Sequence, residues 1–180
     1  MKLYTVGHGT HNIGKFISLL DENGIALLVD VRSSPCSRYN PQFNKENLAF
    51  VLPQHEIQYA WAGKYLGGRP SDPTCYRNKI YPQGDTDFLH LVDYPEVMKR
   101  RWFVQGVRRL IELADEQVTA IMCSEEDPAE CHRHHLIAKY IMDKYPEVDV
   151  HHIRGDSTVF GAASILVSVY KPEVEQLTLF

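Results

Sequence analysis

The chain has 180 residues, of which 44% are hydrophobic and 23% are charged, and this composition excludes extensive disorder and favours one folded domain. The formal net charge of −4 at pH 7 excludes binding to nucleic acid by overall basicity, so such binding would need a local cationic patch. No apolar run approaches the roughly 18 residues of a membrane span, and residues 1–10 lack the apolar core of a signal peptide. We therefore expect a cytoplasmic protein without membrane contact, whose four cysteines remain thiols.

Apolar runs alternate with stretches of helical periodicity along most of the chain. In chain order the pattern predicts a strand over residues 3–7, a helix over 13–23, a strand over 25–31, a helix over 45–55, a strand over 57–61, a long irregular loop over 62–95, a helix over 96–116, a strand over 118–123, a helix over 128–145 and a strand over 148–153. Strands that alternate with helices are typical of βαβ units. We expect a single Rossmann-like three-layer α/β domain over residues 1–170, with a mostly parallel sheet, and a tail over residues 171–180.

Ligands of such folds bind beyond the carboxyl ends of the strands, which makes the strand ends candidate sites. His8 lies between two glycines after the first strand, where it could carry a proton or simply cap a loop. Asp30 and Arg32 share one face at the end of the second strand, either as site residues or as a structural ion pair. Guanidinium and hydroxyl groups gather here and suit a phosphate or a carboxylate; they belong to Arg32, Ser33, Ser37 and Arg38.

The segment after the strand predicted over residues 118–123 carries a strong signal for the start of a helix. Asp127 is expected as the N-cap, Pro128 as the first helical residue and Glu130 as the third, which would place Cys131 in or near the first turn. The positive end of a helix lowers the pKa of a nearby thiol and attracts anions. Cys123, at the strand end, and Cys131 are therefore candidate nucleophiles, although Cys131 also fits a small core residue.

An unbroken helix over residues 128–145 would turn about 100° per residue and so sort its side chains by direction. Arg133 and His134 would project toward the buried stripe, whereas His132 would point to solvent. A buried Arg133 would need an anion or a carboxylate as its partner, which the strand ends could supply.

Metal and phosphate-loop motifs are weak in this sequence. No cysteine is followed six positions later by arginine, and no glycine-rich nucleotide motif occurs. Zinc ligands are available, but their spacing matches no standard pattern; they are Cys123, Cys131, His132, His134 and His135. We therefore expect no metal and no cofactor, with a divalent metal as the alternative.

The loop over residues 62–95 interleaves aromatic and basic residues, Tyr65 and Arg69 among them. This arrangement can grip bases and phosphates, or it can pack over a core. We expect the loop to cover part of the pocket at the strand ends.

Several segments together resemble the bacterial and archaeal family called domain of unknown function 488. They are residues 4–8, 30–38, 65–68, 123–128 and 131–133. The resemblance implies a small Rossmann-like α/β fold and implies no reaction.

Two functions from different classes follow. The first is an enzyme that acts on nucleic acid or another phosphate-bearing substrate. Its acid–base groups and nucleophiles would come from His8, Asp30, Cys123, Glu125, Cys131 and His132. Its anion-binding groups would come from Arg32, Ser33, Ser37, Arg38, Tyr65 and Arg133. The second is a non-catalytic adaptor for nucleic acid or protein, in which the polar strand ends only stabilise the fold.

The last five residues resemble the Gln-Leu-x-Leu-Phe motif by which bacterial proteins dock on the replication sliding clamp. Gln176 would donate and accept hydrogen bonds, and the apolar anchors would be Leu177, Leu179 and Phe180. The other interpretation is that this end folds back on its own domain. Docking on the clamp would place the protein at replicating or repaired DNA.

Overall fold

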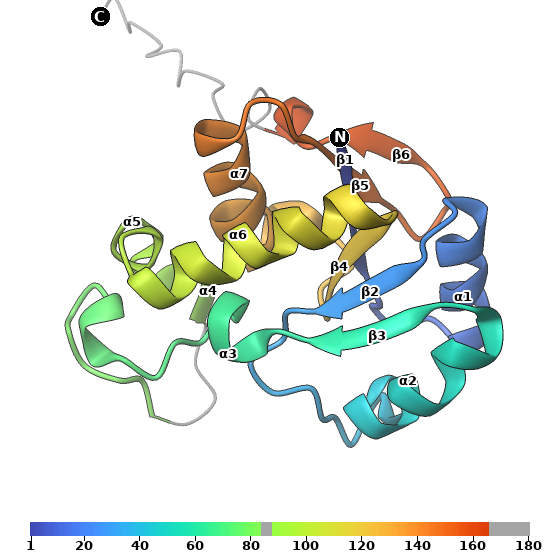
Figure 1. The fold of residues 1–180 in the computed structure, drawn as a ribbon. Coiled ribbons are helices and arrows are strands. Elements are labelled where there is room, and N and C mark those ends of the chain that lie inside the picture. Colours follow the sequence, from blue (N-terminus) through green and yellow to red (C-terminus); the bar gives the residue numbers. More distant parts are fainter. Residues whose placement is uncertain (84–87, 166–180) are drawn as a thin grey trace, which may run out of the picture.

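The computed structural model describes residues 1–83 and 88–165, and within them six strands form one sheet in the order β3-β2-β4-β1-β5-β6 (Figure 1). The parallel strands are β1 (Lys2–Gly7), β2 (Leu27–Asp30), β3 (Gln58–Trp61), β4 (Thr119–Cys123) and β5 (Asp149–Ile153). The edge strand β6 (Val159–Gly161) runs antiparallel to β5. The expected α/β fold with a mostly parallel sheet is confirmed.

Helices cover both faces of the sheet, as Figure 1 shows. Buried residues of α1 (Ile13–Glu22) and α2 (Lys45–Val51) form one hydrophobic cluster with inward-facing residues of β1, β2 and β4. Buried residues of α6 (Arg101–Glu116) and α7 (Lys139–Lys144) form a second cluster with the opposite face of the same strands. The described chain therefore has the three layers of a Rossmann-like domain.

Local sequence explains the first βα unit. The side chain of Asn12 accepts a hydrogen bond of 2.8 Å from the backbone N–H of Lys15, which starts α1. Phe16 and Leu20 lie on the apolar stripe of the helix and are fully buried. Gly24 ends the unit with φ of 63°, a conformation that glycine adopts without strain.

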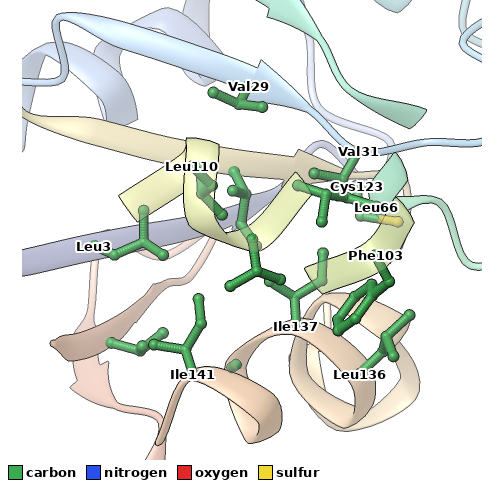
Figure 2. Packing of buried hydrophobic residues seen from close by; sticks show 14 of the residues in the cluster. Leu3, Val29, Val31, Leu66, Phe103, Leu110, Cys123, Leu136, Ile137 and Ile141 are labelled. Carbon is green, nitrogen blue, oxygen red and sulfur yellow. The ribbon is translucent and has the colours of Figure 1, made fainter. Parts of the chain in front are cut away.

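The second cluster reaches the carboxyl end of the sheet at Cys123, the last residue of β4. Figure 2 shows Cys123 beside Val31 and Leu66, with Phe103 of α6 farther along the same core. Close packing on this side fixes the main chain of Cys123, and so the position from which its sulfur projects.

The helix expected over residues 96–116 is wrong as one element. Two helices occur there, α5 (Tyr94–Met98) and α6, and Arg100 between them has an extended conformation with ψ of 132°. Asp93 caps the first helix, and the Arg100 guanidinium turns away to donate a hydrogen bond of 2.6 Å to Thr74 Oγ1. This tertiary contact overrides the helical periodicity.

The unbroken helix expected over residues 128–145 is also wrong. Asp127 does act as a cap, but it closes only a short 3₁₀ turn, η4 (Pro128–Glu130). Cys131 then adopts an extended conformation, with φ of −135° and ψ of 141°. A π-helical turn, η5 (Arg133–Ala138), follows and leads into α7. Both features change the direction of every side chain relative to a regular helix.

The irregular loop expected over residues 62–95 contains short helical pieces in its described part. They are α3 (Gly63–Leu66), η3 (Pro73–Cys75), α4 (Phe88–Leu91) and the start of α5. The tail expected over residues 171–180 lies outside the described residues. None of the helices in the described part of the chain is long and apolar enough to cross a membrane.

A buried chain of polar groups links β1, β5 and η5. His152 is fully buried, its Nδ1 lies 2.7 Å from Thr5 Oγ1, and its Nε2 lies 3.0 Å from Nδ1 of His134. Arg133 donates to Thr5 Oγ1 over 3.2 Å, and the positive charges of Arg133 and Arg154 act on His152. Desolvation by burial, with the nearby positive groups, lowers the pKa of His152 to about 3. Both His152 and the ring of His134 are therefore neutral in the folded protein.

Acid is expected to destabilise the protein through His152. The folded pKa is about 3 and the ordinary value is 6.5, so the contribution to stability is complete above pH 6.5 and is lost as the pH falls toward 3. Each pH unit in that window costs up to about 1.4 kcal/mol, because only the unfolded state binds the proton. Urea unfolding of the parent and of His152→Asn across this window checks the prediction. Equal pH slopes for both proteins would contradict it.

Candidate functional site

A cavity of about 620 Å³ opens at the carboxyl edge of the sheet, a volume in the range typical of small-molecule sites. Its walls come from the segments after β2 and β4 and from the segment that carries α3 to α5. The lining residues are Arg32, Ser33, Ser34, Cys36, Ser37, Gly68, Arg69, Phe88, Leu89, His90, Tyr94, Cys123, Ser124, Glu125, Glu130, Cys131 and His132. The loop over residues 62–95, expected to cover part of this pocket, supplies six of the lining residues, and its role as a cover stays a prediction.

The sheet topology explains why a cavity forms here. β1 and β4 are neighbours, but the chain leaves β1 toward β2 and leaves β4 toward β5, on the opposite side. Such a switch point opens a crevice between the two strand ends. Backbone hydrogen bonds tie the two exits together, from His8 N to Cys123 O over 3.0 Å and from Gly9 N to Ser124 O over 2.9 Å.

Two thiols and an imidazole meet in the cavity wall. Cys123, Cys131 and His132 are all buried, with 6%, 1% and 8% of their surface exposed. Nδ1 of His132 lies 3.5 Å from Sγ of Cys123 and 3.9 Å from Sγ of Cys131. All four cysteines of the chain, including this pair, are free thiols.

The two thiols have different acidities. A hydrogen bond to Cys131, together with burial, raises the pKa of Cys123 well above its ordinary value. Burial also acts to raise the pKa of Cys131, but hydrogen bonds from Cys123 and His132 outweigh burial and leave the pKa of Cys131 well below its ordinary value. Cys131 is therefore the sulfur that ionises first, with Cys123 as its hydrogen-bond donor.

The prediction that His132 points to solvent is wrong. The extended conformation of Cys131 breaks the helical turn, so the His132 ring folds into the cavity wall. Gly68 makes room for it, since a Cβ on Gly68 would lie 2.6 Å from Cγ of His132. Nε2 of His132 is buried and has no hydrogen-bond partner among the described residues.

Arg133 is fully buried, as expected, but the prediction that it needs an anionic partner is wrong. It donates hydrogen bonds to the backbone carbonyls of Glu125 and Glu126 and to Thr5 Oγ1. These contacts hold the loop after β4 in place. Arg133 does not line the cavity, and carbonyl oxygens satisfy its guanidinium without a ligand.

Arg32 lines the cavity from the end of β2 and is held by Asp30. Its Nε and Nη2 donate to the two carboxylate oxygens of Asp30 over 2.9 and 2.6 Å, and Nη2 also donates to the carbonyl of Phe43. Asp30 is fully buried, accepts a further bond of 2.8 Å from Tyr59, and does not line the cavity. Asp30 therefore positions Arg32 and is not in reach of a ligand.

His8 lies behind Arg32 and does not line the cavity. Its Nε2 is 3.3 Å from Nη1 of Arg32, and its ring stacks on Phe43 with 4.3 Å between centroids. Burial, and then the neighbouring Arg32 charge, lower the pKa of His8 to about 4, although a hydrogen bond to Gly9 and the Asp30 charge oppose this. A neutral His8 can accept a hydrogen bond from Arg32 and so helps to orient it.

Arg69 brings a second guanidinium to the cavity, and no acidic side chain pairs with it among the described residues. Its backbone N–H donates to Ser33 Oγ over 2.9 Å, and its guanidinium lies 4.5 Å from the ring of Phe88. Ser37 lines the cavity and accepts hydrogen bonds from two backbone N–H groups. Two other predicted residues are elsewhere: Arg38 is exposed outside the cavity, and Tyr65 lines a separate, apolar groove.

Glu125 is a carboxylic acid at the rim of the cavity. Desolvation of the part of its side chain that faces the wall, and then the nearby Cys131 sulfur, raise its pKa above the ordinary value. A carboxyl group beside a thiol pair is a candidate for proton transfer in the cavity.

A comparison with protein-family models gives one description, "Domain of unknown function DUF488", which matches residues 12–141. The chain belongs to this family. The match covers more than half of the chain and includes the cavity residues that follow β2 and β4. His8 precedes the matched residues. Searches of the curated proteins and of the solved structures found no match. Membership of the DUF488 family agrees with the resemblance, and the description of the family names no reaction.

Proposed function

We propose that the protein is an enzyme that acts on a phosphate-bearing substrate, with nucleic acid as the favoured class, in the cavity at the carboxyl edge of the sheet. One observation carries this proposal. A wall of guanidinium and hydroxyl groups faces the same cavity as a centre of two thiols, an imidazole and a carboxyl group. The first wall suits an anion, and the second supplies reactive groups.

The residues have separate roles in this proposal. Arg32, fixed by Asp30, and Arg69, which has no acidic partner among the described residues, bind the anionic group. Cys123, Cys131 and His132 form the reactive centre, and Glu125 transfers a proton. His8 and Arg133 act as positioning residues, because neither lines the cavity.

A substrate screen tests the proposal. The protein is incubated with phosphomonoesters, nucleotides, single-stranded DNA and RNA, and the products are identified by mass spectrometry. Conversion of one class is expected, with loss in Cys131→Ser and in Glu125→Gln and retention in Cys75→Ser, whose thiol is buried away from the cavity. Equal conversion by Cys131→Ser and the parent would reject the assignment of the centre.

Arg69→Gln is expected to weaken binding of a 5′-phosphorylated single-stranded hexanucleotide by about tenfold or more, since one charge-assisted hydrogen bond contributes roughly 1.5–3 kcal/mol. Isothermal titration at constant salt measures the change. Arg77→Gln is the matched control, because Arg77 is exposed and lies outside the cavity. Equal weakening by the two variants would mean that only net charge matters.

A non-catalytic adaptor is the second candidate, and a specific observation favours it. Asp30 with Arg32, and Arg133 with its carbonyl partners, are satisfied within the fold, as structural polar clusters would be. The adaptor predicts binding of the same hexanucleotide without conversion of any substrate. The screen described above separates the two candidates.

We further propose that residues 176–180 dock on a bacterial sliding clamp; these residues lie outside the described part of the chain, and only their sequence supports the proposal. Leu179 and Phe180 would fill an apolar pocket of the clamp, and Gln176 would hydrogen bond through its amide. Purified clamp is expected to bind the intact protein and not a variant truncated after Glu175. Equal binding by both, or none by the intact protein at micromolar concentrations, would reject docking.

A further inference from the structure

Three ligand atoms of the kind that bind transition metals lie together in the cavity wall. Sγ of Cys123, Sγ of Cys131 and a ring nitrogen of His132 are all within 4.8 Å of one another. We propose that these three residues bind one Zn²⁺ ion and leave its fourth coordination position open to the cavity. The proposal deepens the proposed function by naming the nature of the reactive centre, but metal binding itself does not depend on the reaction.

The distances between the ligand atoms fit a tetrahedral zinc site. Zinc bonds of about 2.3 Å to sulfur and 2.0–2.1 Å to nitrogen place a sulfur and a nitrogen ligand about 3.6 Å apart. Nδ1 of His132 lies 3.5 Å from one sulfur and 3.9 Å from the other. Both sulfur-to-nitrogen distances therefore lie within a few tenths of an ångström of the separation in a tetrahedral zinc site.

Each ligand is held by its own element. Cys123 ends β4, whose five residues are all buried. Cys131 is fixed in an extended conformation by its N–H bond to Pro128 O, and its sulfur accepts a bond of 3.4 Å from the backbone N–H of Arg133. Bonds from N–H groups to a sulfur ligand are typical of the second shell of metal–thiolate sites.

Packing and the hydrogen bonds of Nδ1 to the sulfur pair set the orientation of His132. Among the described residues its Nδ1 has the two sulfurs as neighbours, and its buried Nε2 has no partner. The missing Cβ of Gly68 leaves the space that the ring occupies. The imidazole is thus held with Nδ1 toward the sulfur pair, which is where a metal ligand must point.

The ligand chemistry selects the metal class. Two thiolates and an imidazole favour Zn²⁺ over Mg²⁺ or Ca²⁺, which prefer oxygen ligands. Zinc binding requires both sulfurs as thiolates, so any thiol proton still bound is released to solvent, and two thiolates would balance the charge of the ion in this buried position. A buried metal–thiolate group is therefore neutral without help from another residue.

The cavity decides between a structural and a catalytic type of site. Structural zinc sites have four protein ligands, whereas catalytic sites have three and keep one position for water or substrate. Cys123, Cys131 and His132 all line the cavity, together with Glu125. A zinc ion here would face the space where the anionic group is proposed to bind and would polarise its oxygen atoms.

Metal binding to the intact protein tests the proposal. Protein stripped with a chelator under reducing conditions is titrated with Zn²⁺ in competition with a chromophoric chelator, and separately with Co²⁺. One ion per chain is expected, and the Co²⁺ protein should show sulfur-to-cobalt charge transfer and the strong visible bands of tetrahedral coordination. Cys123→Ser and Cys131→Ser should each weaken Zn²⁺ binding by more than about 100-fold, beyond the cost of losing a second-shell partner.

Cys75→Ser serves as the matched control, since this buried thiol lies outside the cluster, and it should bind as the parent does. Thermal unfolding confirms that each variant is folded. A Co²⁺ spectrum without sulfur charge transfer, or no saturable Zn²⁺ binding by the parent, would overturn the proposal whether or not the variants fold. Metal binding without turnover would reject the proposed function alone, and turnover by a parent protein that binds no Zn²⁺ would reject the zinc site alone.

Discussion

Asp30→Asn is expected to lower the free energy of unfolding by about 3–5 kcal/mol, the cost of leaving one member of a buried ion pair alone. Asp30 is fully buried, and Arg32 is 5% exposed. The carboxylate accepts two bonds from the guanidinium, one from the backbone N–H of Arg32 and one from Tyr59. Asparagine removes the charge and one acceptor, so the Arg32 charge stays buried without compensation. Urea denaturation at neutral pH measures the loss.

The double variant Asp30→Asn with Arg32→Met provides the matched control. It removes the charge that the single variant leaves unpaired, and it should recover much of the lost stability. It should also lose binding of the phosphorylated hexanucleotide, because Arg32 lines the cavity. A single variant within about 1 kcal/mol of the parent would show that water reaches this pair and that Asp30 does not hold Arg32.

Gly7→Ala is expected to destabilise the protein by about 3 kcal/mol or more, at or beyond the upper end for overpacking. A Cβ at this position would lie 1.8 Å from the carbonyl oxygen of Glu125 and 2.8 Å from Cα of Glu126. The loop cannot move aside cheaply, because Arg133 holds both of its carbonyls. The same clash would shift Glu125, so substrate conversion should fall as well.

Gly14→Ala is the control for Gly7→Ala, since it makes the same change in a helix with space. The nearest atom to a Cβ there is Asn12 Oδ1 at 3.4 Å. Alanine is favoured over glycine in helices by up to about 1 kcal/mol, so no loss of stability is expected. Thermal unfolding of the two variants checks this contrast. Similar unfolding midpoints for the two variants would contradict the steric clash that is expected at Gly7.

The strands and most of the helices could be predicted because their signals are local. The apolar run over residues 25–31 contains β2, and the helical periodicity over residues 13–23 contains α1. The rule that ligands bind at the carboxyl ends of parallel strands then pointed to Arg32 and Cys123, and both residues line the cavity. These inferences needed only the order of elements and not their distances.

The interior of the site could not be predicted in the same way. The direction of His132 was extrapolated from an unbroken helix, and the extended conformation of Cys131 removes that premise. The partners of Arg133 are backbone carbonyls, which every residue carries and no sequence pattern marks. Gly68 lies against His132 because of the path that the loop between β3 and α6 takes. Its one sequence signal was its place in residues 65–68, a segment of the family resemblance.

Amide chemical-shift mapping with the phosphorylated hexanucleotide is the most direct test that this cavity binds a phosphate-bearing substrate. Saturable shifts are expected for the backbone N–H groups of Ser33, Arg69 and Ser124, on three segments that all line the cavity. Ser18, on the outer face of α1, should not shift. Shifts confined to the basic residues of α6, or no saturable shifts at all, would contradict the account.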